Sequence, residues 1–180
     1  MRRRPLGRLA QALGLMTHAL LLAALLVGTA SEPQSAPEEV FSKVATDPIP
    51  ACGPGRTDAL ANGALTIMPG QTVCISVQAR GDSVVPVAVV SAYTPDTTLV
   101  IRFWQEPEAG DTYLAVYNPL DGLLQYQAAM RLPDSLLPKH TSTCPVLSRR
   151  RGIERWPHPV ATLVLSDFKL LADSASMTCQ

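Results

Sequence analysis

The residue types that most often perform chemistry are few in this chain, and their spacing matches no catalytic motif. After residue 30 the candidate bases are His140 and His158, which both lie in a proline-rich stretch. No serine occupies a Gly-x-Ser-x-Gly turn, the motif that presents the nucleophile of an α/β-hydrolase. We therefore interpret both histidines as loop residues, and we keep as an alternative a secreted hydrolase that uses His158 or loop carboxylates.

Carboxylates gather in one expected connection between strands, at Glu106, Glu108 and Asp111. Calcium accepts carboxylate oxygens from loops, but the alternating aspartate spacing of a calcium-binding loop is absent here. We interpret these carboxylates as solvated turn residues. The sequence predicts neither a metal site nor another cofactor.

Four cysteines, Cys52, Cys74, Cys144 and Cys179, follow residue 30. An even number in an exported chain predicts two disulfides, because the compartment is oxidising. Three pairings are possible, and we favour Cys52–Cys74 together with Cys144–Cys179. A zinc site is disfavoured, since no Cys-x-x-Cys or Cys-x-His pair is present.

The first residues of the chain have the pattern of an export signal. Four arginines lie between residues 2 and 8, an apolar stretch covers 13–27, and Gly28-Thr29-Ala30 follows with the small residues that signal peptidase selects. This pattern predicts a signal peptide over 1–30, cleaved after Ala30, and a periplasmic or extracellular protein. The alternative is an uncleaved membrane anchor, but a span of about 20 residues would include His18.

Removal of that signal changes the charge of the protein. The whole chain has 15 basic and 15 acidic residues, and residues 1–30 hold four arginines and no acid, so 11 basic residues remain against 15 acidic ones. A net charge of −4 repels phosphate backbones, so we expect no nucleic-acid partner. We expect membrane contact only through an uncleaved signal or through association with the envelope.

The elements that must position any site are β-strands. Residues 31–58 are rich in Pro, Ser, Glu and Ala and are expected to be a flexible lead-in. Residues 59–180 are expected to form one domain of short β-branched runs separated by turn residues. The runs are 64–68, 72–79, 84–93, 97–106, 111–117, 123–132 and 160–171.

About seven strands without an intervening amphipathic helix predict an all-β fold, an antiparallel β-sandwich with Ig-like or fibronectin-like topology, stapled by the disulfides. A small barrel is the alternative. Most runs alternate between apolar and polar residues, as half-buried strands do. Residues 84–93 are apolar on both faces and predict a central strand, in which Pro86 requires a bulge or a position without a ladder hydrogen bond.

Four side chains are expected on the sheet face opposite the aliphatic one. They are Arg102, Trp104, Tyr113 and Tyr117, and on neighbouring strands they would form a flat patch able to stack on a sugar or to receive a protein. The alternative is that a loop or the lead-in covers them, or that they are cross-strand pairs that stabilise the sheet.

The basic cluster Arg149, Arg150, Arg151 and Arg155 is interpreted as a solvated loop, with an anionic glycan or lipid headgroup as the other possibility.

The sequence as a whole favours an exported, non-enzymatic binding protein of the cell envelope or extracellular space, with a protein or glycan partner. Besides the hydrolase, a structural subunit that adds strands at an open sheet edge is an alternative.

Overall fold

The computed structural model of the chain describes residues 48–53, 57–172 and 177–180. The predicted signal peptide and lead-in residues 31–47 lie outside the described residues, so cleavage after Ala30 stays a prediction. The described part is almost entirely β-strand. Its one helical element is a 3-10 turn, Thr57–Ala59. The described residues thus include no helix long and apolar enough to cross a membrane.

Ten strands make up the described fold, and all the pairings between them are antiparallel. They are β1 (Leu60–Ala61), β2 (Ala64–Ile67), β3 (Gln71–Arg80), β4 (Ser83–Val90), β5 (Thr98–Gln105), β6 (Thr112–Tyr117), β7 (Leu123–Arg131), β8 (Lys139–Thr141), β9 (Arg151–Trp156) and β10 (Thr162–Leu171).

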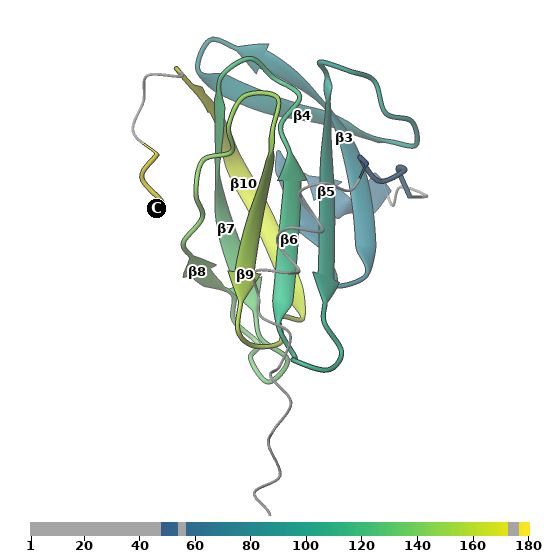
Figure 1. Ribbon diagram of the computed structural model, residues 1–180, viewed down its shortest axis with the longest axis vertical. Coiled ribbons are helices and arrows are strands. Elements are labelled where there is room, and N and C mark those ends of the chain that lie inside the picture. The colour runs from purple at the N-terminus through teal and green to yellow at the C-terminus, as the bar shows by residue number, and fades with distance from the viewer. Residues whose placement is uncertain (1–47, 54–56, 173–176) are drawn as a thin grey trace, which may run out of the picture. The chain divides into compact units, whose positions relative to one another are not determined.

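The hydrogen-bonded ladders define two layers (Figure 1). One layer runs in the order β4-β3-β5-β6-β9, and the other in the order β1-β2-β10-β7-β8. β10 joins them, because it pairs with β2 through Leu163–Leu165 and then with β4 at Lys169. A bulge between Ser166 and Lys169 lies at this change of partner. The predicted antiparallel sandwich is confirmed.

The core lies between the two layers and is formed by the predicted apolar faces. Period-two alternation sends every second side chain of a strand to the same side of the sheet. The aliphatic and aromatic side chains on the inner side are buried together, including Val73, Ile75, Leu99, Ile101, Phe103, Leu114, Val116, Leu124, Tyr126, Leu163 and Leu165. All seven predicted runs are strands, with ends that differ by a few residues.

Three strands were not predicted, and β9 is the important one. Its sequence, residues 151–156, was interpreted as a solvated arginine-rich loop, which is wrong. The inner positions of β9 hold Gly152, Glu154 and Trp156 instead of aliphatic residues, so the apolar alternation that marks a strand is missing. Gly152 is required there, since an added Cβ would lie 2.6 Å from a methyl carbon of Val146.

Pro86 lies at a bulge, as predicted. The register between β3 and β4 shifts after Ser76, which pairs with Ala88, whereas Val77 pairs with Pro86 and leaves Val87 unmatched. A bulge frees a position from the regular ladder, which suits a residue without an N–H group. The second edge of β4 is paired only at Ser83, so this strand is less central than its apolar sequence predicted.

Both disulfides have the favoured pairing, Cys52–Cys74 and Cys144–Cys179. The first joins the lead-in to β3, and the second joins the C-terminal residues to the loop that precedes β9. Two disulfides indicate an oxidising, exported environment.

Candidate functional site

The four predicted site residues lie together on the outer face of the β5–β6 ladder. Register pairs Trp104 with Tyr113 and sets Tyr117 opposite Val100, with Arg102 between them on the same face. This juxtaposition follows from the register, because side chains two residues apart share a face and antiparallel partners lie side by side.

A stack of charged and aromatic groups occupies one end of this face. The rings of Trp104 and Tyr113 are nearly parallel, with centroids 5.2 Å apart and an interplanar angle of 13°. The Arg102 guanidinium carbon lies 5.0 Å from the centre of the Trp104 ring. The face of an aromatic ring is electron-rich, so it attracts the cation and holds the arginine in place.

Tyr113 supports this stack instead of presenting a free surface, since only 2 % of it is exposed. Its hydroxyl lies 3.4 Å from a carboxylate oxygen of Asp111, and Arg155 donates to the same oxygen from Nε at 2.7 Å. Burial, reinforced by the Asp111 charge, raises the pKa of the Tyr113 hydroxyl. Asp111 is therefore an ion-pair partner that anchors β9 beside β6.

The other end of the face carries Tyr117, whose ring meets the edge of Tyr93 at a centroid distance of 6.2 Å. Strand β9 extends the face, because Arg151 pairs with Tyr117 and Ile153 pairs with Ala115. Sequence reasoning missed Arg151 and Arg155 as members of this face. The signal that could have found them is the alternation of Arg151, Ile153 and Arg155.

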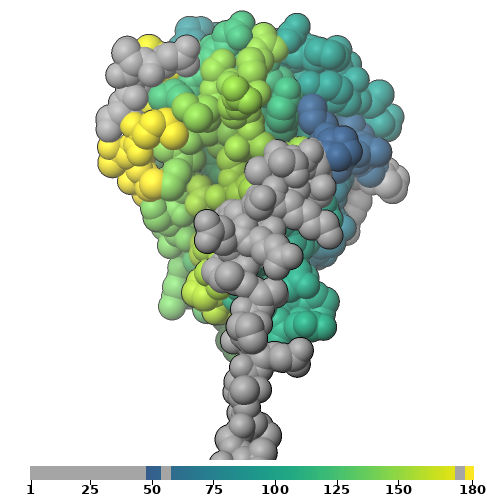
Figure 2. Space-filling model, in the orientation of Figure 1, coloured from purple at the N-terminus to yellow at the C-terminus, as the bar shows by residue number. Residues whose placement is uncertain are grey.

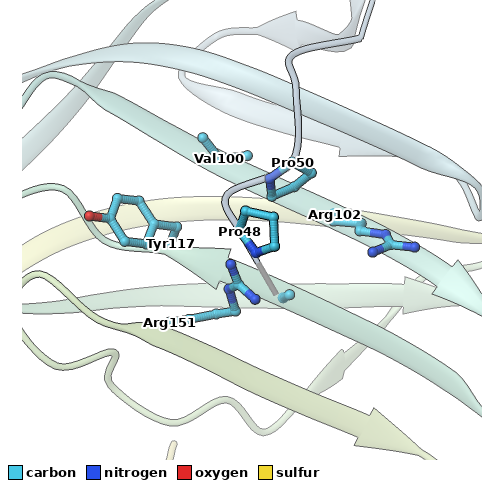
Figure 3. Close-up of a pocket in the computed structure, with 7 residues that line it drawn as sticks. Pro48, Pro50, Val100, Arg102, Tyr117 and Arg151 are labelled. Carbon is cyan, nitrogen blue, oxygen red and sulfur yellow. The ribbon is translucent and has the colours of Figure 1, made fainter. Parts of the chain in front are cut away.

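Residues 48–53 lie on the outside of this face (Figure 2). Pro48 and Pro50 close a cavity of about 20 Å³ against Val100, Arg102, Ala115, Tyr117 and Arg151. Figure 3 shows both prolines over the strands, with Tyr117 to one side and Arg102 to the other. The cavity has room for one water molecule, so a sugar ring or peptide side chain can enter only if the prolines move. The end of the lead-in thus covers part of the face, and Trp104 and Tyr113 form a cross-strand pair, as the alternative interpretation expected.

The remaining member of the basic cluster with a defined role is Arg149. Its guanidinium binds Asp121 with Nε at 2.8 Å and also contacts Asp96. It thereby links the turn before β5 to the turn before β7, and both partners are carboxylates of the protein itself. Arg149 thus links two turns from an exposed position, and Arg149 and Arg150 lie in a solvated loop as predicted, whereas Arg151 and Arg155 lie in β9.

The other predicted chemical groups do not assemble into a site within the described residues. A ring nitrogen of His158 lies 3.2 Å from the carbonyl oxygen of Pro159, and neither His158 nor His140 has a carboxylate or serine within hydrogen-bond reach there. The same part of the chain holds no group of three or more His, Cys, Asp or Glu side chains that could bind a metal ion.

Comparison with known proteins adds no relative: no family model, curated protein or solved structure matches the chain. The outer face is therefore interpreted from its own geometry.

One ionisable side chain lies on the inner side of β9, behind the candidate site. Glu154 Oε1 accepts a hydrogen bond from the backbone N–H of Cys144 at 2.7 Å. Burial raises the pKa of the Glu154 carboxyl, and the Cys144 N–H opposes this only in part. The charge of Glu154 in turn adds to the effect of burial in raising the pKa of Tyr126.

We expect Glu154→Gln to increase stability near neutral pH by less than about 1 kcal/mol, since partial solvation weakens the effect. Glutamine keeps an acceptor for the Cys144 N–H and removes the charge. The pKa of the Glu154 carboxyl is higher in the folded protein than in the unfolded chain, so the folded wild type binds more protons. Wild type therefore loses stability as the pH rises from the unfolded pKa of this carboxyl through its folded pKa. Urea unfolding between pH 4 and 8 should show this slope in wild type and a flatter one in the variant. If the free energy of unfolding changed equally with pH in both proteins, the raised pKa of Glu154 would be contradicted.

Proposed function

We propose that the chain is an exported, non-enzymatic binding protein whose outer face on β5, β6 and β9 receives a protein or glycan partner in the periplasm or extracellular space. The observation that best supports this proposal is the stack of Arg102 on Trp104 on Tyr113. Cross-strand register and the Asp111–Arg155 ion pair hold this stack in place. Aromatic and arginine side chains are the types most enriched at the energetic centres of interfaces. The disulfides support the location, because they persist in oxidising compartments.

The face is suited to recognition because its groups are held in place before a partner arrives. Trp104 cannot turn freely while it is stacked between Arg102 and Tyr113. Its ordering upon binding therefore costs little side-chain entropy, a cost that otherwise reduces affinity. Trp104, Arg102 and Tyr117 each keep part of their surface accessible, whereas Tyr113 is buried.

The double variant Trp104→Ala/Tyr117→Ala is expected to weaken partner binding by at least about tenfold, the effect of losing one or two interface anchors. A glycan array, and a pull-down from the envelope and extracellular fractions of the source cells, would identify the partner class. The matched control is Leu136→Ala/Leu137→Ala, which removes two exposed apolar side chains from the loop between β7 and β8. Binding that is lost equally in both variants, or in neither, would exclude this face.

A further inference from the structure

Residues 48–53, here named the strap, cross the outer face from β3 to β9. At one end Cys52 is bonded to Cys74 of β3, and Gly53 lies so close to β3 that an added Cβ would be 2.9 Å from the Thr72 carbonyl oxygen. At the other end Pro48 shares the cavity with Arg151 of β9. The strap therefore passes over β5 and β6, which lie between these strands (Figure 3).

The strap must be extended to cover this width. Three strand spacings separate β3 from β9, which amounts to about 14 Å. The four residue steps from Pro48 to Cys52 span about 12 to 14 Å in polyproline II or β conformation. The two prolines favour this shape, because each fixes its own φ and restricts the residue before it.

Few interactions hold the strap. Within the described part of the chain, residues 48–53 form no hydrogen bond with the sheet, so the disulfide and the apolar contacts of Pro48 and Pro50 secure it. Such contacts can be exchanged for those of another chain with the same chemistry. The strap thus shows what kind of segment the outer face accepts; the part of this face beneath the strap, formed by Val100, Arg102, Ala115, Tyr117 and Arg151, is here named the groove.

One group beside the strap lacks an opposite charge. Within the described residues, the guanidinium of Arg102 lies over the Trp104 ring, and no carboxylate forms an ion pair with it. Guanidinium groups offer five donors suited to carboxylates. A segment that satisfied Arg102 as well as the apolar groove would bind more tightly than prolines alone.

We propose that the outer face is a groove for an extended, proline-containing peptide that carries a carboxylate, and that the strap occupies this groove in cis. This inference rests on the proposed function and names the partner class. Aromatic-lined grooves recognise proline-rich segments, because these are ordered before they bind. The prolines of the partner would replace Pro48 and Pro50 against Tyr117 and Val100, and its carboxylate would bind Arg102.

The test measures fluorescence polarisation with a labelled peptide that reproduces residues 46–51 (TDPIPA). In the full chain, Pro48→Gly/Pro50→Gly removes the apolar contacts of the strap and makes its free state more flexible, while the disulfide is kept. We expect this variant to bind TDPIPA about tenfold more tightly than wild type, because an intramolecular competitor has been weakened. Adding Arg102→Ala should reverse most of the gain, and Arg102→Lys should restore part of it.

The control peptide TDAIAA lacks both prolines, and thermal unfolding checks that each variant is folded. Equal affinity of a folded Pro48→Gly/Pro50→Gly protein for TDPIPA and TDAIAA would overturn the peptide groove. If that happens while Trp104→Ala/Tyr117→Ala still loses a glycan or a folded protein partner, the proposed function stands and the peptide class is rejected. Binding of TDPIPA that is unchanged by Arg102→Ala would also overturn the proposal, since it needs the carboxylate contact.

Discussion

Replacing Asn118 with alanine is expected to lower the free energy of unfolding by about 3 kcal/mol, because a fully buried amide bonds several backbone groups. Its Nδ2 donates to the carbonyl oxygens of Gly122 at 2.8 Å and of Val146 and Leu147 at 3.2 Å. Its Oδ1 accepts from the N–H of Leu120 at 3.0 Å. Alanine would remove this partner from the Leu120 N–H and the Gly122 carbonyl, whereas the Val146 and Leu147 carbonyls keep the N–H groups of Leu124 and Arg150.

Asn118→Asp should be more harmful than alanine, although the two side chains have the same shape. A carboxylate would lie against three carbonyl oxygens in place of the amide donor, and an unpaired buried charge costs more than a missing hydrogen bond. Urea unfolding of both variants measures the losses. The control is Gln127→Ala on exposed β7 surface, expected within about 0.5 kcal/mol of wild type. A loss for Asn118→Ala below about 1 kcal/mol would contradict this role.

The effect of Asn118 extends to the candidate site. The backbone N–H of Asn118 donates to the Arg150 carbonyl at 2.9 Å, immediately before β9 begins. The side chain of Asn118 and this bond fix the loop from which β9 starts, and β9 supplies Arg151 and Arg155 to the outer face. We therefore expect these variants to weaken partner binding in proportion to their loss of stability.

Sequence reasoning identified the strands that carry their own signal. The run 97–106 is rich in β-branched and aromatic residues, and period two set Leu99, Ile101 and Phe103 on one face and Val100, Arg102 and Trp104 on the other. The local rule set Arg102 and Trp104 on one face, and the register between β5 and β6 places Tyr113 and Tyr117 beside them. The structure thus places these four residues on one face of the β5–β6 ladder, and their role in binding stays a prediction.

The rest of the site depends on long-range contacts that the local sequence does not encode. Strand β9 was missed because its inner positions hold Gly152, Glu154 and Trp156. Each of them fits a particular neighbour, such as the Cys144 N–H for Glu154. The covering of the face by Pro48 and Pro50 follows from the Cys52–Cys74 disulfide, a pairing that spacing favoured but did not determine. Residues 48–53 pair with no strand, so their sequence has no apolar alternation from which their position on the sheet could be predicted.

The double variant Cys52→Ala/Cys74→Ala is expected to lower the free energy of unfolding by about 3 kcal/mol, because the unfolded chain gains conformational freedom. Cys144→Ala/Cys179→Ala is the matched control. The two bonds close loops with sequence separations of 22 and 35 residues. In the chain-entropy account these lengths differ in effect by only about 0.4 kcal/mol. Urea unfolding should therefore show similar losses for both variants.

The two variants should differ in binding, and this difference separates the strap from general loosening of the fold. Loss of Cys52–Cys74 frees the strap from β3, so the affinity for TDPIPA should rise about tenfold as the cis competitor loses its tether. Loss of Cys144–Cys179 releases residues 177–180 near Thr143, away from the strap, and should leave that affinity unchanged. An equal rise in both variants would assign the effect to reduced stability. A rise in TDPIPA affinity in Cys52→Ala/Cys74→Ala alone would show that the disulfide at β3 controls access to the groove.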